Sequence, residues 1–357
     1  MNKINMALGR VPERIAVFRA LKLGDLLCAV PAFRAVRRAF PNAHIALISL
    51  PWASEFVARF PNYFDEFIAF PGWPGLPEQP LNPAQTVQFL STMQSRQWDL
   101  VLQQQGNGTL INAMLALFGS GAVAGFHPTD HPERFAPNPD LFMPYPPVEH
   151  EIIRHSRLME FLGIPVPGTE LEFPLTDADQ TQLNGLLAAH HLTPGSYVCL
   201  HAGGISGRRW PADRFARVAD ALAERGLTVV LTGTQAELLV AETVQQQMHH
   251  PSVRVVGETN LGSLAALLKG SALLVSNDTG VSHVAAACAV PSVVVFTSAN
   301  PAEWAPLDQQ RHRVVLETEP DIVARVVSEA IDLLNHAKTE HSHLAYSRGV
   351  SDGHHLG

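Results

Sequence analysis

Short apolar runs alternate with helix-like segments along most of this chain, and this alternation limits its fold more than any other feature. In the first half, the runs typical of buried strands lie at residues 14–20, 44–50, 66–70, 98–103 and 122–126. Helical patterns such as LLCAVPAFRAVRRAF stand between them. Strands of this kind, separated by helices, form parallel sheets that are covered on both faces. The first half therefore predicts an α/β domain with a doubly wound sheet.

The second half repeats this alternation after a proline-rich stretch. Seven prolines in the 25 residues from 126 to 150 predict an irregular surface segment or a linker. The apolar runs that follow lie at residues 197–201, 227–233, 272–277 and 291–297. A length of 357 residues also suggests two domains, because single hydrophobic cores stop growing at about 250–300 residues.

These patterns predict two Rossmann-like, doubly wound domains that face each other across a central cleft. We place the N-terminal domain at residues 1–170 and the C-terminal domain at residues 171–318. A helix at residues 319–336 is long enough to pack across both domains. Residues 337–357, which are polar and rich in histidine, are expected to form a flexible tail.

The charge and the cysteine content exclude several classes of protein. A formal net charge of −8 gives no electrostatic reason to expect binding to nucleic acid. The three cysteines are far apart and include no Cys-x-x-Cys pair, which argues against disulfides and zinc ribbons and suits a reducing cytoplasm. No apolar run is long enough for a signal peptide or a membrane-spanning helix. We therefore expect a cytoplasmic protein, with peripheral membrane contact left open.

Ligands of doubly wound sheets bind beyond the carboxyl ends of the strands, so the residues that follow each strand are the candidates for function. After the first strand comes LGDLL, in which Asp25 begins a helix. An aspartate at this place is either a helix cap or a carboxylate poised as a general base.

The segment HAGGISGRRWP follows the first strand of the second half. Gly203 and Gly204 let backbone N–H groups approach a ligand closely. Arg208 and Arg209 follow, and a helix begins just after them. Glycines, guanidinium groups and a helix N-terminus favour a phosphate site, although a flexible loop with solvated arginines has the same sequence.

Two further segments follow strands of the second half. LTGTQAE places Glu237 near a helix start, where glutamate is common for electrostatic reasons and where it would also reach ribose hydroxyls. SNDTGVSH opens a helix of small residues, and its N-terminal N–H groups would bind an anion together with Asp278, Thr279, Gly280 and His283. The alternative is an Asp/Thr helix cap with a buried core histidine.

Several common motifs are absent from the sequence. There is no Gly-x-x-x-x-Gly-Lys-Ser/Thr, no Gly-x-Ser-x-Gly and no His-Glu-x-x-His, which excludes P-loop nucleotide hydrolases and the usual hydrolase and zinc-protease sites. The turn after the first strand has only Gly24 instead of Gly-x-Gly-x-x-Gly, which disfavours a dinucleotide-dependent dehydrogenase.

LGDLL, HAGGISGRRWP, LTG with a following glutamate, and VSNDTGVSHVAAA occur in this order. Together they resemble the motifs of glycosyltransferase family 9, the ADP-heptose:lipopolysaccharide heptosyltransferases and their relatives, over roughly residues 14–335. The resemblance implies a GT-B fold, with an acceptor-binding N-terminal domain and a nucleotide-sugar-binding C-terminal domain. It also implies inverting transfer of a sugar from a nucleotide donor, with no required metal or other cofactor.

The resemblance also implies roles for the candidate residues. Asp25 matches the base that deprotonates the acceptor hydroxyl. Arg208, with Arg209 as its neighbour, matches the diphosphate contact, and Glu237 matches the ribose contact. The residues that match the run holding the diphosphate and donor sugar are Asp278, Thr279, Gly280 and His283.

The sequence departs from the family in the region expected to bind the acceptor. Residues 60–95 contain no lysine or arginine, although Arg134, Arg154 and Arg157 would partly compensate. A polyanionic lipid acceptor is therefore disfavoured relative to a carbohydrate or small molecule. ADP-heptose is the donor that the family implies. Two alternatives are a sugar-nucleotide epimerase and a GT-B protein that binds a nucleotide sugar without transferring it.

Overall fold

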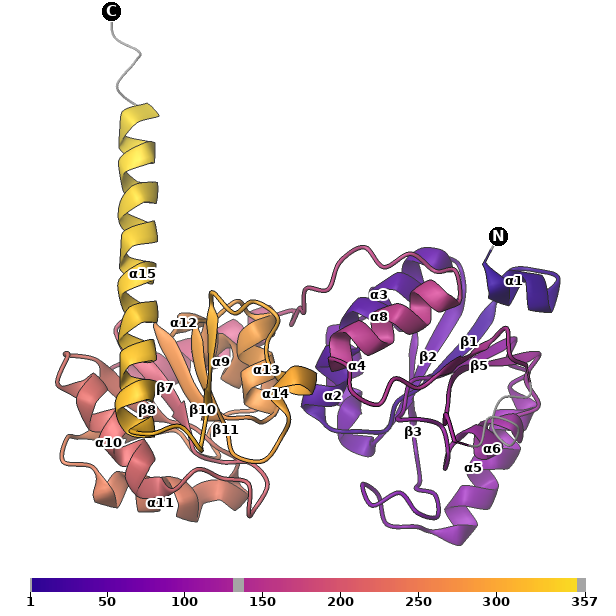
Figure 1. The fold of residues 1–357 in the computed structure, drawn as a ribbon, viewed down its shortest axis with the longest axis horizontal. Helices are drawn as coiled ribbons and strands as arrows, with labels where there is room; N and C mark the ends of the chain where they lie inside the picture. The colour runs from indigo at the N-terminus through magenta and orange to yellow at the C-terminus, as the bar shows by residue number, and fades with distance from the viewer. Residues whose placement is uncertain (1, 131–137, 352–357) are drawn as a thin grey trace, which may run out of the picture. The chain divides into compact units, whose positions relative to one another are not determined.

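The chain forms two compact units, Met1–Pro174 (unit 1) and Leu175–Gly357 (unit 2). The structure, a computed structural model, describes residues 2–130 and 138–351 (Figure 1). Within these residues, each unit contains one six-stranded parallel sheet with helices on both faces. The predicted α/β class with doubly wound sheets is confirmed. That the two domains face each other across a cleft stays a prediction.

The sheet of unit 1 has the strand order β3-β2-β1-β4-β5-β6. Its strands are β1 (Arg14–Phe18), β2 (His44–Ser49), β3 (Glu66–Ala69), β4 (Leu100–Gln103), β5 (Ala122–His127) and β6 (Phe142–Pro144). β1 pairs with β2 on one side and with β4 on the other, so the chain reverses its winding direction between β1 and β4. Ligands of such sheets bind at this switch point, beyond the carboxyl ends of the strands.

The helices of unit 1 cover both faces of this sheet (Figure 1). They are α1 (Lys3–Leu8), α2 (Leu23–Cys28), α3 (Val30–Ala39), α4 (Ser54–Arg59), α5 (Pro83–Ser95), α6 (Asn112–Ala116) and α8 (Glu151–Phe161), with a 3₁₀ turn, η1 (Pro51–Ala53). α3 and α8 pack together on one face. On the face of α5 and α6, Phe18, Phe89 and Trp98 belong to one buried apolar cluster. The packing of this sheet between helices fixes the positions of the carboxyl ends of β1 and β4.

The sheet of unit 2 has the order β12-β11-β10-β7-β8-β9, which repeats the winding of unit 1. Its strands are β7 (Tyr197–His201), β8 (Thr228–Leu231), β9 (Ser252–Arg254), β10 (Leu273–Asn277), β11 (Ser292–Phe296) and β12 (His312–Leu316). Here the switch point lies between β7 and β10, which pair directly.

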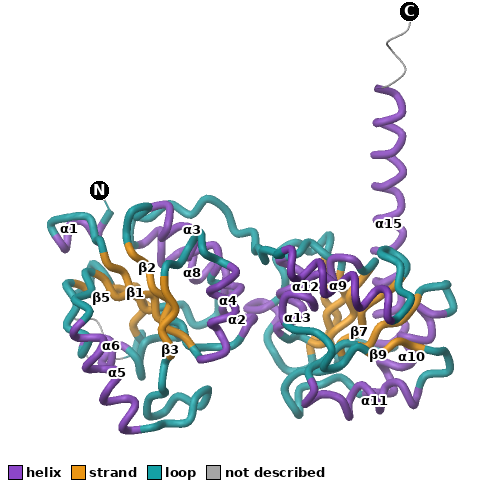
Figure 2. The backbone as a smooth tube through the Cα atoms, turned by 180° about the vertical axis from the view of Figure 1, so that it is seen from behind, coloured by secondary structure: helices purple, strands orange, loops and turns teal. Residues whose placement is uncertain are grey.

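Two layers of helices enclose the sheet of unit 2 (Figure 2). They are α9 (Asp177–Ala189), α10 (Ala212–Ala223), α11 (Leu238–Gln247), α12 (Leu261–Gly270), α13 (Gly280–Ala287), α14 (Pro301–Trp304) and α15 (Ile322–Ser351), with a 3₁₀ turn, η2 (Gln235–Glu237). α10 packs against α11 and α15, whereas α12 packs against α9 and α13. Val198, Phe215 and Val326 join the sheet to α10 and α15 in one core.

The last helix differs from its prediction. α15 packs on α10 and on strands β10 to β12 of unit 2, and it continues to Ser351 instead of ending at residue 336 (Figure 1). No proline interrupts residues 337–351, so nothing in the sequence stops the helix there. Packing of this helix across both domains and flexibility of the tail stay predictions.

Three strands were missed by the sequence patterns. β6 lies inside the proline-rich stretch, at an edge of its sheet, where a missing backbone N–H costs no ladder hydrogen bond. β9 and β12 are also edge strands, and β9 has three residues. Short edge strands lack the continuous apolar run that marks a central strand. Across the described part of the chain, no helix is both long and apolar enough to traverse a bilayer.

Candidate functional site

In unit 2, two of the predicted segments come together at the switch point of the sheet. Gly203 and Gly204 follow β7, and Asp278 and Thr279 follow β10. Because β7 and β10 are paired neighbours, the two loops leave the same edge of the sheet side by side. A methyl group added to Gly204 would lie 3.6 Å from Cβ of Thr279. The structure thus brings the two loops together, and that they form one binding site stays a prediction.

The loop that follows β7 and contains Gly203 and Gly204 is called the glycine loop here. Asn277, the last residue of β10, holds this loop in place. Its side-chain amide donates to the carbonyl oxygens of Ala202, at 3.1 Å, and Gly203, at 2.9 Å. Its Oδ1 accepts the N–H of Trp210 at 2.9 Å. The side chain is 1% exposed, so these three bonds replace contacts with water. The sequence patterns did not single out Asn277, although its position at the end of a strand was a signal.

Glu237 connects a third loop, the one that follows β8, to the loop of Gly204. It ends the 3₁₀ turn η2 instead of lying in the first turn of an α-helix. Its Oε1 accepts the N–H of Gly204 at 2.6 Å, and its Oε2 accepts the N–H and the hydroxyl of Thr234, both at 2.8 Å. Burial acts to raise the pKa of Glu237, but the hydrogen bonds from Thr234, the neighbouring His201 and the bond from Gly204 hold that pKa below its ordinary value. Glu237 is therefore an ionised carboxylate that shapes the glycine loop.

The glycines are required where they stand. Cβ of an alanine at position 203 would lie 2.3 Å from Oε1 of Glu237 and 2.8 Å from Nε2 of His201. Gly204 has a φ of +117°, which side-chain-bearing residues rarely adopt. The loop is thus packed against Glu237 through its backbone alone.

The two predicted arginines differ in their surroundings. Arg209 is partly buried, and its Nε donates to the carbonyl oxygen of Gly204 at 2.8 Å. Arg208 is exposed, and its carbonyl oxygen accepts the hydroxyl of Thr297 at 2.7 Å. No ion pair of the Arg208 guanidinium is found among the described residues. Arg208 is therefore the more available cation, while Arg209 shapes the loop.

Helix α13 begins at this site. Thr279 is its N-cap residue, with extended backbone, but its side chain makes no capping hydrogen bond. Thr279 therefore occupies the N-cap position of the alternative interpretation, but its hydroxyl does not cap the helix. The first N–H groups of a helix lack partners within it, which makes this end an anion-binding position. His283, one turn along, is 5% exposed and lies edge-on to Trp304, with 6.3 Å between ring centroids.

In unit 1, Asp25 lies at the other switch point, in the first turn of α2. Its Oδ2 accepts the N–H of Lys22 at 3.2 Å, so part of the carboxylate does cap the helix. Its side chain remains 23% exposed. Burial, the largest influence, raises the pKa of Asp25 above its ordinary value; Arg19 opposes this rise and Glu151 adds to it. A carboxylate with a raised pKa and an accessible edge is suited to general base catalysis.

Behind Asp25 lies a buried group of charges that the sequence did not reveal. Arg19, at the end of β1, is fully buried and donates from Nη2 to Oε1 of Glu151 at 2.8 Å. Glu151 also pairs with Arg154 and accepts Nε2 of His155 at 3.1 Å. Arg154 is therefore a buried structural cation, which corrects the expectation that it grips an acceptor. Arg157 pairs with Glu149 at 2.5 Å, and Arg134 lies outside the described residues.

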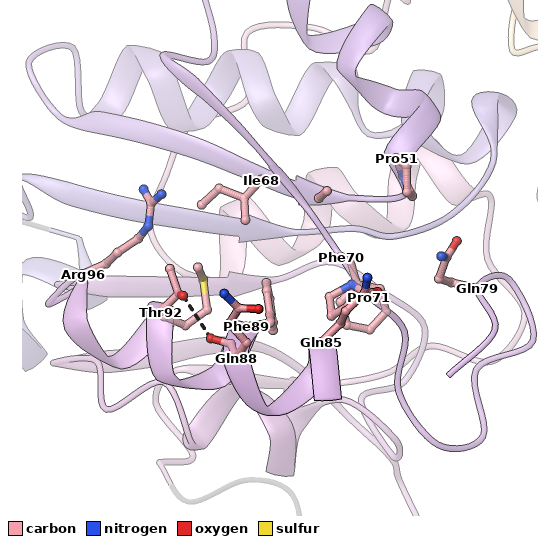
Figure 3. Close-up of a pocket in the computed structure, with 12 residues that line it drawn as sticks. Pro51, Ile68, Phe70, Pro71, Gln79, Gln85, Gln88, Phe89, Thr92 and Arg96 are labelled. Atoms are coloured by element: carbon pink, nitrogen blue, oxygen red, sulfur yellow. Dashed lines mark hydrogen bonds between the residues drawn. The ribbon is translucent and has the colours of Figure 1, made fainter. Parts of the chain in front are cut away.

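A pocket of about 360 Å³ lies in unit 1 between β3 and α5 (Figure 3). Its apolar lining includes Ile68, Phe70 and Phe89, and three glutamines, at positions 79, 85 and 88, supply amides. Arg96 is the one charged lining residue, and it pairs with Glu66 at 2.7 Å. None of the predicted site residues lines this pocket. It offers apolar surface and neutral hydrogen-bonding groups.

A metal site was not predicted, and among the described residues no group of three or more His, Cys, Asp or Glu side chains is arranged to hold an ion.

Comparison with known protein sequences gives matches of two kinds. A model of glycosyltransferase family 9 (heptosyltransferase) matches residues 87–330. Lipooligosaccharide heptosyltransferase 2 from Haemophilus ducreyi is 30% identical over 109 residues, and the match covers 29% of this chain and 31% of that protein, about a third of its length. Lipopolysaccharide heptosyltransferase 1 from Escherichia coli K12 is 25% identical over 309 residues, which are 81% of this chain and 89% of that protein.

Two solved structures share the fold over 91% of this chain. The glycosyltransferase family 9 protein from Veillonella parvula DSM 2008 superposes with a TM-score of 0.76 at 22% identity, over 97% of its own chain. The E. coli ADP-heptose lps heptosyltransferase II superposes with a TM-score of 0.72 at 19% identity, over 99% of its chain. At these identities the likeness concerns the fold, and it confirms the predicted GT-B class.

Proposed function

Because the chain belongs to glycosyltransferase family 9, a family of sugar-transferring enzymes, we propose that it transfers a sugar from a nucleotide-sugar donor to a hydroxyl acceptor. The observation that carries the proposal is the convergence of three loops at the switch point of unit 2. Asn277 and Glu237 hold the glycine loop beside Thr279 and the start of α13. In this proposal the N-terminal N–H groups of α13, the Thr279 hydroxyl and the Arg208 guanidinium bind the diphosphate.

The proposed donor is ADP-heptose. Support comes from a protein of the same fold, the E. coli ADP-heptose lps heptosyltransferase II. The leaving diphosphate gains charge as the glycosidic bond breaks. Donors fixed in advance around that charge stabilise the transition state, and removing one such donor typically slows catalysis by about 10²–10³-fold. In this proposal Arg208, Thr279, His283 and the N–H groups of α13 perform that task without a divalent cation.

Asp25 is the proposed general base of an inverting reaction. Its carboxylate would take the proton of the acceptor hydroxyl while the oxygen attacks the anomeric carbon from the face opposite the diphosphate. The raised pKa of Asp25 supports this role, because a base works best when its pKa lies near the working pH.

The proposed acceptor is a carbohydrate or small molecule with few negative charges. Residues 60–95 have no lysine or arginine, and the pocket between β3 and α5 has neutral lining apart from the paired Arg96. A polyanionic acceptor would leave its charges without partners there. We place the reaction in the cytoplasm.

An assay of ADP release from ADP-heptose tests this function. We expect release with a neutral oligosaccharide acceptor to exceed release with a phosphorylated lipopolysaccharide inner-core oligosaccharide. Release that occurs only with the phosphorylated oligosaccharide would contradict the proposed acceptor class. Conversion of the donor to a stereoisomer without ADP release would point to an epimerase, and binding without any conversion would point to a non-catalytic protein.

A further inference from the structure

Arg19 contacts the backbone of Asp25 more closely than it contacts the Asp25 carboxylate. Its Nε donates to the carbonyl oxygen of Asp25 at 2.8 Å, which is a normal hydrogen bond. Its Nη2 lies 3.8 Å from Oδ1 of Asp25, beyond hydrogen-bond distance. The same Nη2 lies 2.8 Å from Oε1 of Glu151. The guanidinium is thus directed to Glu151, while the Asp25 carboxylate is left with a looser contact.

The charged groups around Asp25 come from three elements. Arg19 directly follows β1, Lys22 precedes α2 and supplies a backbone N–H, and Glu151 begins α8. Behind Glu151, on the same helix, Arg154 pairs with its Oε2 and His155 donates to its Oε1. Burial lowers the pKa of His155 to about 4, so this ring is neutral at pH 7 and donates from Nε2. Glu151 therefore has three partners and a fixed position.

A simple buried ion pair between Arg19 and Asp25 would oppose catalysis. A guanidinium within about 4–6 Å favours the ionised carboxylate and typically lowers its pKa by about 1–3 units, which weakens it as a base. Because Glu151 is the closer partner of the guanidinium, Arg19 lowers the pKa of Asp25 by less than burial and Glu151 raise it.

We propose that Glu151 is a positioning residue for Asp25: it anchors the Arg19 guanidinium so that Arg19 hydrogen-bonds to the backbone of α2 but stays beyond hydrogen-bond distance of the Asp25 carboxylate. The inference rests on the proposed role of Asp25 as general base. It assigns a function to α8, which begins at Glu151, 126 positions after Asp25 in the chain. Removing the Glu151 charge would free Arg19 to close on Asp25.

Glu151→Gln tests this in the full-length chain, because glutamine keeps the shape and one acceptor oxygen but removes the charge. The readout is the pKa of Asp25, measured by ¹³C NMR of protein labelled at the aspartate carboxyl carbons and assigned through the signal lost in Asp25→Asn. We expect Glu151→Gln to lower the pKa of Asp25 by about one unit or more. With Asp25 as the base, we expect the acid limb of kcat/KM against pH to follow this titration and to move to lower pH by the same amount in Glu151→Gln.

The matched control is Glu149→Gln, which removes a carboxylate paired with the half-exposed Arg157 and should leave the Asp25 titration unchanged. If Glu151→Gln does not fold, Glu151→Asp provides the test, since its shorter side chain retains the charge but holds Arg19 less closely; a smaller decrease is expected. An unchanged or raised pKa of Asp25 in a folded variant overturns the inference. Full transfer activity in Asp25→Asn overturns the proposed base instead, whatever the NMR titration shows.

Discussion

Replacing Asp25 with asparagine should slow sugar transfer by roughly 10²–10⁴-fold, the usual contribution of a general base, while the affinity for ADP stays unchanged. Asparagine has nearly the same shape and can still accept the N–H of Lys22, which Oδ2 of Asp25 accepts at 3.2 Å. It cannot accept a proton from the acceptor hydroxyl. The decisive measurements are kcat from initial rates of ADP release and the ADP dissociation constant by calorimetry.

Asp179 is a matched control for the alternative that Asp25 merely caps its helix. It occupies the same third position of α9, and its Oδ2 accepts the N–H of Thr176, three residues earlier, at 2.8 Å. Asp179→Asn should therefore change thermal stability about as much as Asp25→Asn but leave kcat unaffected. If both variants retain wild-type kcat, Asp25 is a cap and not the base.

Arg208→Ala should weaken ADP binding by roughly ten- to a hundredfold, since a hydrogen bond to a charged group contributes about 1.5–3 kcal/mol. The guanidinium is exposed beside a loop that Asn277 and Glu237 hold in place, so its loss should not disturb that loop. His283→Ala should weaken binding as well, because the ring lies one turn into α13. Both dissociation constants can be measured by calorimetric titration with ADP.

Arg217→Ala controls for the loss of one positive charge from unit 2. This arginine lies on the exposed side of α10, outside the three loops of the site. Its removal should leave ADP affinity unchanged. Wild-type affinity in both Arg208→Ala and His283→Ala would refute the diphosphate site, whereas equal losses in Arg208→Ala and Arg217→Ala would indicate a general charge effect.

The central strands and the residues that follow them could be predicted from the sequence. β1, β7 and β10 are continuous apolar runs, because both faces of a parallel sheet are buried. The carboxyl ends of parallel strands lie at one edge of the sheet, so the sequence alone predicts that the residues following these strands lie at the same edge. Edge strands such as β6 carry no such signal, since only part of their surface is buried.

Contacts between distant segments could not be predicted in this way. In the sequence Arg19 is a charged residue within the apolar run at residues 14–20. Nothing in the sequence links it to Glu151, which follows it by 132 positions. The sequence allows two roles for Glu237, a residue at a helix start or a contact to ribose hydroxyls. The structure shows that both of its carboxylate oxygens accept hydrogen bonds from the protein. Such pairings depend on how loops pack after the sheets have formed, and periodicity carries no information about them.

The most direct test of the central claim, that unit 2 holds a nucleoside diphosphate donor, is calorimetric titration of the full-length protein with ADP, GDP and UDP in the presence of a chelator. We predict saturable binding of ADP with a clear preference over GDP and UDP, and weaker binding in Arg208→Ala. Preference for GDP or UDP would retain the site but replace the donor. Absence of binding to all three nucleotides would contradict the account.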